Sequence, residues 1–152
     1  PPAERHQRAQ YRIQRLGSGL RRHHGVEHLV YASSSSVYGQ TDGSIVDESS
    51  CTEPLTETGR VLLDAEELVL GYGGSVARLA GIYGPGRSYL LKRYLEGAAQ
   101  IDGESPEAEG RWINQVHCQD AASALAHLTA IDGATGRLHV WRAARAHDRG
   151  VF

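Results

Sequence analysis

The sequence predicts an α/β fold with a parallel sheet. Short apolar runs at about residues 27–32, 74–80 and 112–117 have the length and composition of buried strands. Segments with apolar residues at helical spacing separate or follow these runs. Strands that alternate with helices favour a parallel sheet covered by helices. No internal repeat is visible.

The first elements are a helix and a strand. Apolar residues recur near helical spacing between about residues 6 and 24, and Gly25 would end this helix. Its last turn is basic, and cations favour the negative end of a helix dipole. The alternative interpretation of this basic cluster is a phosphate site, and the helix-end explanation is preferred. The run 27–32 then forms a strand.

A long loop and a second helix follow. The loop, from Ser34 to about Glu57, contains the turn dipeptide Asp42-Gly43, and long loops in compact domains are usually functional. Thr58 is the expected N-cap of the helix. One face of this helix is apolar, formed by Val61, Leu62, Ala65, Leu68 and Val69.

The second half repeats the alternation. After the strand 74–80, the turn at Gly84-Pro85 opens a short helix whose expected inward residues are Leu90, Leu91, Tyr94 and Leu95. A polar insertion precedes the strand 112–117. The next helix is capped by Asp120, and its inward residues are Ala124, Leu125 and Leu128. Residues 137–141 form one more strand, followed by an irregular basic tail.

Composition limits the classes of function. The 152 residues are 40% apolar, enough for one domain with a core. Sixteen basic and eighteen acidic residues give a net charge of −2, so neither nucleic acid nor an anionic membrane is an expected partner. Cys51 and Cys118 lack zinc or disulfide spacing and are expected to be free thiols. Without a membrane span or signal peptide pattern, the expected location is cytoplasmic.

Four motifs carry a family resemblance over residues 26 to 131. They are LVYASSSSVYG, DAEELVL, VARLAGIYGPGR and RWINQVHCQDAASALAHL. In order and rough spacing they resemble the extended short-chain dehydrogenase/reductases, the NAD-dependent epimerases and dehydratases. The resemblance implies a partial Rossmann-like, doubly wound parallel sheet. Residues 1–133 would be the second part of an NAD(P)-binding domain, and 134–152 a last strand with a basic tail.

The Gly-rich phosphate turn of such domains is absent from the sequence. No G-x-x-G-x-x-G occurs, and the first residues resemble the helix before the family's fourth strand. The sequence is therefore interpreted as a fragment of the domain. The expected cofactor is NAD or NADP. Because the pyrophosphate rests on the Gly-rich turn, this chain alone is expected to bind it weakly or not at all.

By the same resemblance, Ser34 is the candidate catalytic residue. It stands four residues before Tyr38, where the family places the Ser or Thr that hydrogen-bonds the substrate oxygen. Ala32 and Ser33 would line the cofactor, and Ser35 and Tyr38 the substrate. An alternative interpretation is that serines 33 to 36 cap backbone groups at a strand end.

The family's Tyr-x-x-x-Lys pair is missing. With Glu66 set as the acidic residue that follows this pair, Leu62 stands at the lysine position and Thr58 at the tyrosine position. Neither side chain can relay a proton near pH 7. The chain therefore resembles atypical members of the family, and its chemistry requires another acid-base group.

Two later motifs supply the remaining candidates. In GIYGPGR, the resemblance places Gly81, Ile82 and Tyr83 beside the nicotinamide, and Arg87 near a substrate anion or in solvent. Gly81 stands where sugar-nucleotide epimerases carry Asn, which argues against a standard nucleotide-sugar substrate. In INQVHCQDAASAL, His117 is a candidate substrate ligand, or is only hydrogen-bonded.

The sequence thus predicts an NAD(P)-dependent, epimerase/dehydratase-like oxidoreductase acting on a small molecule with a sugar or related hydroxyl. The alternatives are a non-catalytic NAD(P)-binding or sensor module and an inactive truncated product. Ser34, Tyr38, Arg87 and His117 are expected to share one cleft at the carboxyl edge of the strands. Because the strand 27–32 would lack its partner, self-association through the sheet edge is also expected.

Overall fold

The computed structural model describes residues 19, 26–87, 92, 95–96, 112–131 and 133–145. These residues form two three-stranded sheets. The first contains β1 (Val30–Ser34), β2 (Ser75–Leu79) and β5 (Gly136–Val140), and the second contains β3 (Gly81–Tyr83), β4 (Trp112–His117) and β6 (Arg142–Arg145). The helices are α2 (Glu57–Gly71), α4 (Cys118–Ala130) and the short 3-10 helix η1 (Ser35–Val37).

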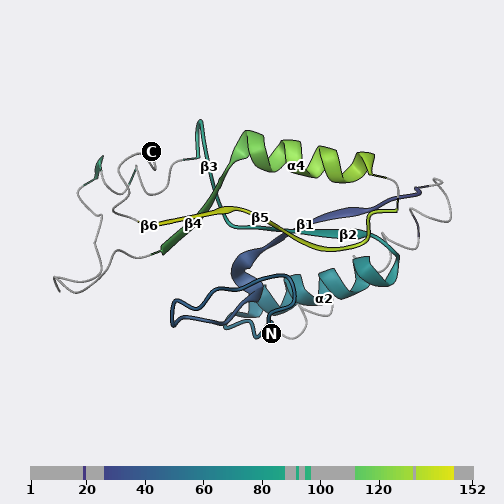
Figure 1. Ribbon diagram of the computed structural model, residues 1–152, viewed down its shortest axis with the longest axis horizontal. Coiled ribbons are helices and arrows are strands. Elements are labelled where there is room, and N and C mark those ends of the chain that lie inside the picture. The colour runs from purple at the N-terminus through teal and green to yellow at the C-terminus, as the bar shows by residue number, and fades with distance from the viewer. Residues whose placement is uncertain are drawn as a thin grey trace.

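The first sheet is parallel and covered on both faces. Its order is β1-β2-β5, with β2 paired in parallel to both neighbours. Figure 1 shows α4 along one face of this sheet and α2 along the other. The α/β class with a partial Rossmann-like parallel sheet is therefore confirmed.

The two faces of the sheet differ in chemistry. All five residues of β2 are buried, and successive side chains of a strand point to opposite faces. On the α4 face, Leu79 forms an apolar cluster with Val116 and Ala121. The opposite face carries Val76 and the buried Arg78. A charged side chain thus occupies the centre of the face that α2 covers.

The helix caps lie two and three residues before the expected positions. Thr56, not Thr58, caps α2, since its hydroxyl accepts from the Gly59 N–H at 3.1 Å. His117, not Asp120, caps α4, because its Nδ1 accepts from the Gln119 N–H at 3.3 Å. Asp120 lies in the first turn, where a carboxylate still favours the positive end of the helix dipole.

The strands agree with the sequence, with two corrections. β1 begins at Val30 and extends to Ser34, beyond the expected run 27–32. Residues 142–145, expected to be an irregular tail, form β6, which pairs antiparallel with β4. Pairing with a distant strand overrides weak local propensity there. The strands expected at 74–80, 112–117 and 137–141 are confirmed within one residue.

Two expected helices lie largely outside the described residues. In the first of these helices, Gly19 is described. In the helix expected after Gly84-Pro85, Lys92 and Leu95 are described. Leu95 was expected to point inward, but 74% of its surface is exposed. Within the described ranges, no helix has the length and apolar character needed to cross a membrane.

Candidate functional site

Three polar residues line up across the parallel sheet. Ser33 of β1 is in register with Arg78 of β2, which is in register with His139 of β5. In a parallel sheet, residues in register project to the same face. This row therefore faces α2, near the carboxyl ends of the strands.

Glu66 of α2 meets this row in a fully buried ion pair. The Nη2 atom of Arg78 lies 2.6 Å from Glu66 Oε2, and Nε donates to both carboxylate oxygens at 3.0 and 3.1 Å. Ser33 Oγ donates to Glu66 Oε1 at 2.5 Å. Burial alone would lower the pKa of Arg78, but the hydrogen bonds and charge of Glu66 raise it above its ordinary value. The guanidinium therefore stays charged.

Further hydrogen bonds connect this ion pair to the loop between η1 and α2. Arg78 Nη1 donates to the Tyr38 hydroxyl oxygen at 2.5 Å, and the Tyr38 hydroxyl donates to the Asp47 carbonyl oxygen at 2.8 Å. His139 Nε2 lies 2.5 Å from the same hydroxyl oxygen. Burial raises the pKa of Tyr38, although Arg78 acts in the opposite direction. The phenol therefore keeps its proton at neutral pH.

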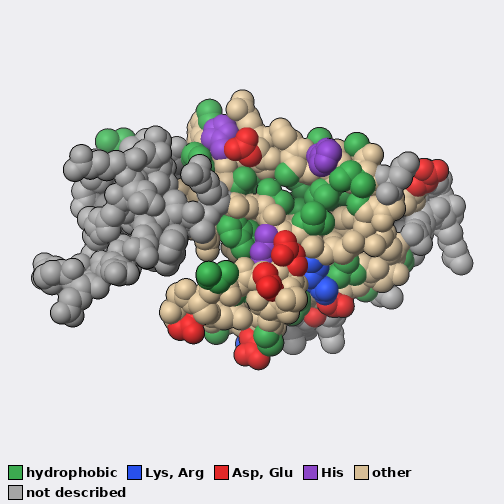
Figure 2. Space-filling view, viewed as in Figure 1, with side chains coloured by type: hydrophobic (Ala, Val, Ile, Leu, Met, Phe, Trp, Pro, Cys, Tyr) green, Lys and Arg blue, Asp and Glu red, His purple; other side chains and the backbone are tan. Residues whose placement is uncertain are grey.

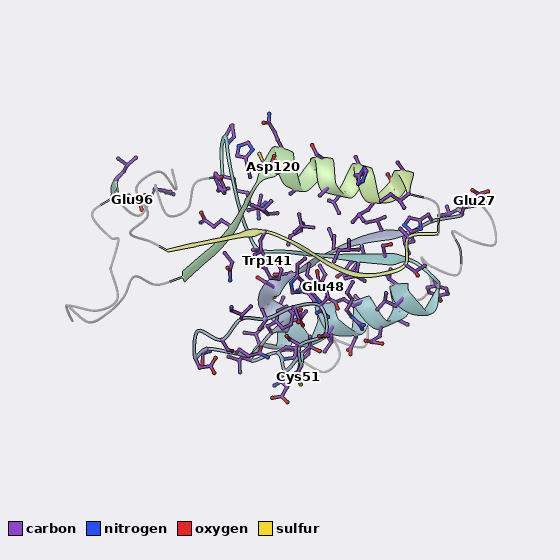
Figure 3. The ribbon with its side chains drawn as sticks, in the orientation of Figure 1. Glu27, Glu48, Cys51, Glu96, Asp120 and Trp141 are labelled. Atoms are coloured by element: carbon purple, nitrogen blue, oxygen red, sulfur yellow. The ribbon has the colours of Figure 1, made fainter. Side chains whose placement is uncertain are left out.

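His139 completes the network at the edge strand. Its backbone N–H donates to Glu48 Oε1 at 2.8 Å, and its ring stacks on Trp141 with 3.9 Å between centroids. Burial lowers the pKa of His139, which keeps the imidazole neutral near pH 7. In Figure 3, Glu48 lies on the side of the sheet that α2 covers. Figure 2 shows acidic, basic and histidine side chains gathered in this central part of the surface.

Ser34 caps a backbone group in this conformation. Its Oγ accepts from the Ser36 N–H at 3.2 Å at the start of η1, which is the capping alternative raised by the sequence. Ser33 directs its hydroxyl to Glu66, Ser35 accepts the Tyr38 N–H through its carbonyl, and Ala32 is exposed. Their roles toward substrate and cofactor stay predictions.

The other predicted site residues gather around β3 and β4. The rings of Tyr83 and His117 are in edge contact, 5.3 Å between centroids. Gly81 and Ile82 pair with β4, and Arg87 is exposed after the turn. Among the described residues, no hydrogen bond, ion pair or ring contact joins Tyr38 to His117. The shared cleft stays a prediction.

Arg78 and His139 were not predicted as site residues from the sequence, and Glu66 served only to align a motif. A signal was present for Arg78, because an arginine inside the short apolar run SVARLAG requires a buried partner. No comparable signal marks His139, which lies 61 positions after Arg78 and 101 positions after Tyr38 in the chain.

Within the described residues, no group of three or more His, Cys, Asp or Glu side chains could hold a metal ion. Cys51 is an exposed free thiol, and Cys118 is a half-buried one. The hydroxyl, phenol and imidazole groups of the described site can form hydrogen bonds and exchange protons.

Similar proteins agree with this architecture. No known protein-family profile matches the chain. Protein YeeZ of Escherichia coli K12 is 34% identical over 108 residues, which are 69% of this chain and 36% of YeeZ. The structure of MoeE5 with UDP-glucose and NAD is 30% identical and has a TM-score of 0.68, covering 88% of this chain and 48% of MoeE5.

A candidate NAD-dependent epimerase/dehydratase from Methylobacillus flagellatus is 26% identical, with a TM-score of 0.65 over 91% of this chain and 54% of its own. RMD from Pseudomonas aeruginosa, solved with NADPH, shares the fold, with a TM-score of 0.72 over 95% of this chain at 22% identity.

These similarities define the class as Rossmann-like α/β proteins with a parallel sheet. Within that class, the chain has part of the fold of NAD-dependent epimerase/dehydratase structures, and the resemblance seen in the sequence is confirmed at that level. The chain spans about a third of YeeZ and about half of the solved relatives.

Proposed function

We propose that this chain is the substrate-side part of an NAD(P)-dependent oxidoreductase that acts on a hydroxyl of a sugar or related small molecule. The observation that carries this proposal is the place of Ser34. It ends β1 at the carboxyl edge of the parallel sheet, where open α/β sheets bind their ligands. MoeE5, which has a similar fold, was solved with UDP-glucose and NAD.

The hydroxyl of Ser34 is suited to bind a substrate oxygen. It accepts one hydrogen bond from the Ser36 N–H, and a serine hydroxyl has in addition one proton to donate. A bound nicotinamide would supply the hydride acceptor. Ala32, Ser33 and the segment Gly81–Tyr83 would lie beside it, and Arg87 would be available to an anionic group of the substrate.

A second candidate function is a non-catalytic NAD(P)-binding or sensor module. This function is favoured by the residues that stand in place of the Tyr-x-x-x-Lys pair. They are Thr58, which is exposed, and Leu62, which is half-buried, both on α2. Neither side chain transfers protons near pH 7. Oxidation of a hydroxyl substrate with nicotinamide reduction would support the enzyme, whereas binding without turnover would support the sensor.

Weak ligand contacts can be measured by NMR on the chain. Millimolar NAD should shift the amide signals of Ser34 and of residues 81–83, because a dissociation constant near 1 mM corresponds to only about −4 kcal/mol. Ser34→Ala should reduce the shifts, and Ser44→Ala, in an exposed part of the loop, should not. Shifts confined to other surfaces would contradict the proposal.

Calorimetry tests the expectation that this chain lacks the phosphate site. Titration with NAD and NADP should show no binding in the low micromolar range, about −8 kcal/mol. A few contacts at the nicotinamide end must offset several kcal/mol of lost translational and rotational freedom. Low micromolar binding would reveal another phosphate site and overturn the interpretation of the chain as part of a domain.

A further inference from the structure

The turn that follows β1 carries the candidate catalytic hydroxyl of Ser34. Ser34 ends β1, and η1 begins directly after it. The Ser36 N–H donates to Ser34 Oγ at 3.2 Å, and the Tyr38 N–H donates to the Ser35 carbonyl at 3.1 Å. Both hydrogen bonds lie inside the turn and do not tie it to the rest of the molecule. The direction of the Ser34 hydroxyl therefore depends on what holds η1 in place.

Apolar and steric contacts fix the distance between η1 and α2. Val37, inside η1, is fully buried. A Cβ atom on Gly59 of α2 would overlap the Ser36 carbonyl oxygen, so the two backbones are in close contact. Apolar packing has no preferred direction. It holds η1 near the helix but leaves the orientation of the turn to polar contacts.

Arg78 of β2 provides a directional contact at the end of the turn. Its Nη1 donates to the Tyr38 hydroxyl at 2.5 Å, and its guanidinium carbon lies 4.9 Å from the centroid of the Tyr38 ring. The hydroxyl and the ring thus meet the same cation, and a hydrogen bond from a charged donor is stronger than a neutral one. Since Tyr38 directly follows η1, Arg78 fixes the end of the turn opposite Ser34.

The guanidinium of Arg78 is itself immobilised. Its Nε and Nη2 meet the carboxylate of Glu66, which also accepts from Ser33 Oγ. Nε, Nη1 and Nη2 belong to one planar group, so the contact with Glu66 sets the direction in which Nη1 reaches Tyr38. Both charged side chains are fully buried, and separating them would leave each charge without compensation.

The hydroxyl of Tyr38 is fully used by contacts within the chain. A phenol has one proton to donate and two acceptor positions. The proton goes to the Asp47 carbonyl, and Arg78 Nη1 takes one acceptor position. His139 Nε2, 2.5 Å away, takes the other when it carries the ring proton. A substrate would have to displace one of these partners, so this hydroxyl is suited to hold the turn rather than to bind substrate.

We propose that Arg78 is a positioning residue for Ser34: its guanidinium, fixed by Glu66, holds Tyr38 and with it the turn that directs the Ser34 hydroxyl. Tyr38 is then also a positioning residue, in place of the substrate contact expected from the sequence. Arg78 acts through Tyr38 and touches neither substrate nor cofactor. The role toward substrate rests on the proposed function, whereas the order of the turn does not.

NMR relaxation of two variants tests the anchor. Tyr38→Phe keeps the ring and removes the hydroxyl, so backbone order parameters of residues 34–37 should fall from about 0.85 toward about 0.6. His139→Phe is the matched control, because it removes the other side-chain contact of the hydroxyl, keeps a ring beside Trp141 and leaves the Arg78 contact. The turn should stay ordered in this control. An ordered turn in Tyr38→Phe, or an equal loss in both variants, would overturn the proposal.

Arg78→Lys tests the guanidinium itself. Lysine keeps a positive charge beside Glu66, but its single ammonium lacks the planar fork that meets Glu66 and Tyr38 together. The turn should lose order as in Tyr38→Phe, and the double variant should lose no more than either single one, because both changes remove the same contact. Additive losses would contradict the proposal. If Arg78→Lys does not fold, the comparison of Tyr38→Phe with His139→Phe decides alone.

Amide shifts induced by NAD separate positioning from a general loss of structure. At millimolar NAD, the shift of Ser34 should be largely lost in Tyr38→Phe, whereas the shifts of residues 81–83 should match the wild type. A parallel loss at both places would show that Tyr38 supports the whole fold, and would overturn the positioning role. Absence of all these shifts in the wild type would instead contradict the proposed function, and the order parameters would still decide whether Arg78 holds the turn.

Discussion

Arg78 and Glu66 form the most buried polar contact of the described residues. Their exposed fractions are 1% and 0%, and every buried polar side-chain atom described in the chain has a hydrogen-bond partner. A buried ion pair contributes little net stability compared with apolar residues of the same volume, because both charges lose hydration. Removing one partner has a large cost, since the other charge stays buried without compensation.

Glu66→Gln should therefore destabilise the chain by about 3–5 kcal/mol in the free energy of unfolding. Glu67→Gln is the matched control on the same helix. Glu67 is 65% exposed and pairs with Arg137 at the surface, so its loss should cost under about 1 kcal/mol. Denaturant unfolding of the two variants gives the comparison. Equal losses would show that Arg78 finds solvent or another partner.

Tyr31 should make the chain sensitive to alkaline pH. Burial and then the charge of Glu66 raise its pKa above the ordinary value of about 10. The folded state therefore favours the neutral phenol. This stability is present below about pH 10 and is lost as pH rises through the raised pKa.

Thermal unfolding across alkaline pH, with tyrosinate absorbance, tests the role of Tyr31. Tyr31→Phe should lose less stability than the wild type over this range. An identical decline in both proteins would show that Tyr31 ionises with an ordinary pKa.

At the scale of elements, Gly59 sets how closely α2 approaches η1. A Cβ atom on Gly59 would lie 2.6 Å from the Ser36 carbonyl oxygen and 2.8 Å from Pro54 Cβ. Gly59→Ala should cost about 1–3 kcal/mol through overpacking, in spite of the higher helix propensity of alanine.

Gly71 on the same helix is the control for Gly59. Nothing lies within 4 Å of a Cβ atom placed on it. Gly71→Ala should stabilise the chain by up to about 1 kcal/mol. Measured melting temperatures should therefore move in opposite directions, and a shift of the same sign in both variants would contradict the packing argument.

The sequence predicted elements better than it predicted contacts. The apolar run around Val76 and the apolar face around Ala65 are local signals in the sequence. They predicted a strand and a helix, and the structure confirms these as β2 and α2. Cap positions were wrong by two or three residues because Thr56 and Thr58 are equally good caps in composition, and the geometry of the chain selects between them.

The network around Arg78 depends on the order of strands. Ser33, Arg78 and His139 become neighbours only when β1, β2 and β5 pair in one register. Periodicity in the sequence carries no information on that register between distant strands. Ser33 and Tyr38 were selected through the family resemblance, whereas the partners that hold them were not.

For the whole molecule, β1 is an edge strand of its sheet within the described residues. An edge strand with free backbone groups can pair with another chain. The chain should therefore self-associate or exchange strands, which light scattering would detect. Ala32→Lys places a charge at an exposed position of this edge and should reduce the association. A monodisperse wild-type monomer at high concentration would contradict this expectation.

The contacts of Glu66 also impose an order on folding. Arg78 lies 12 positions away along the chain, Ser33 lies 33 positions away, and Arg137 lies 71 positions away. Contacts between distant residues require the closure of long loops and form slowly. During synthesis, Arg78 is available to neutralise the carboxylate long before Arg137 leaves the ribosome. The helix and the central strand can thus associate early without a lone buried charge, and β5 joins a unit that is already electrically balanced.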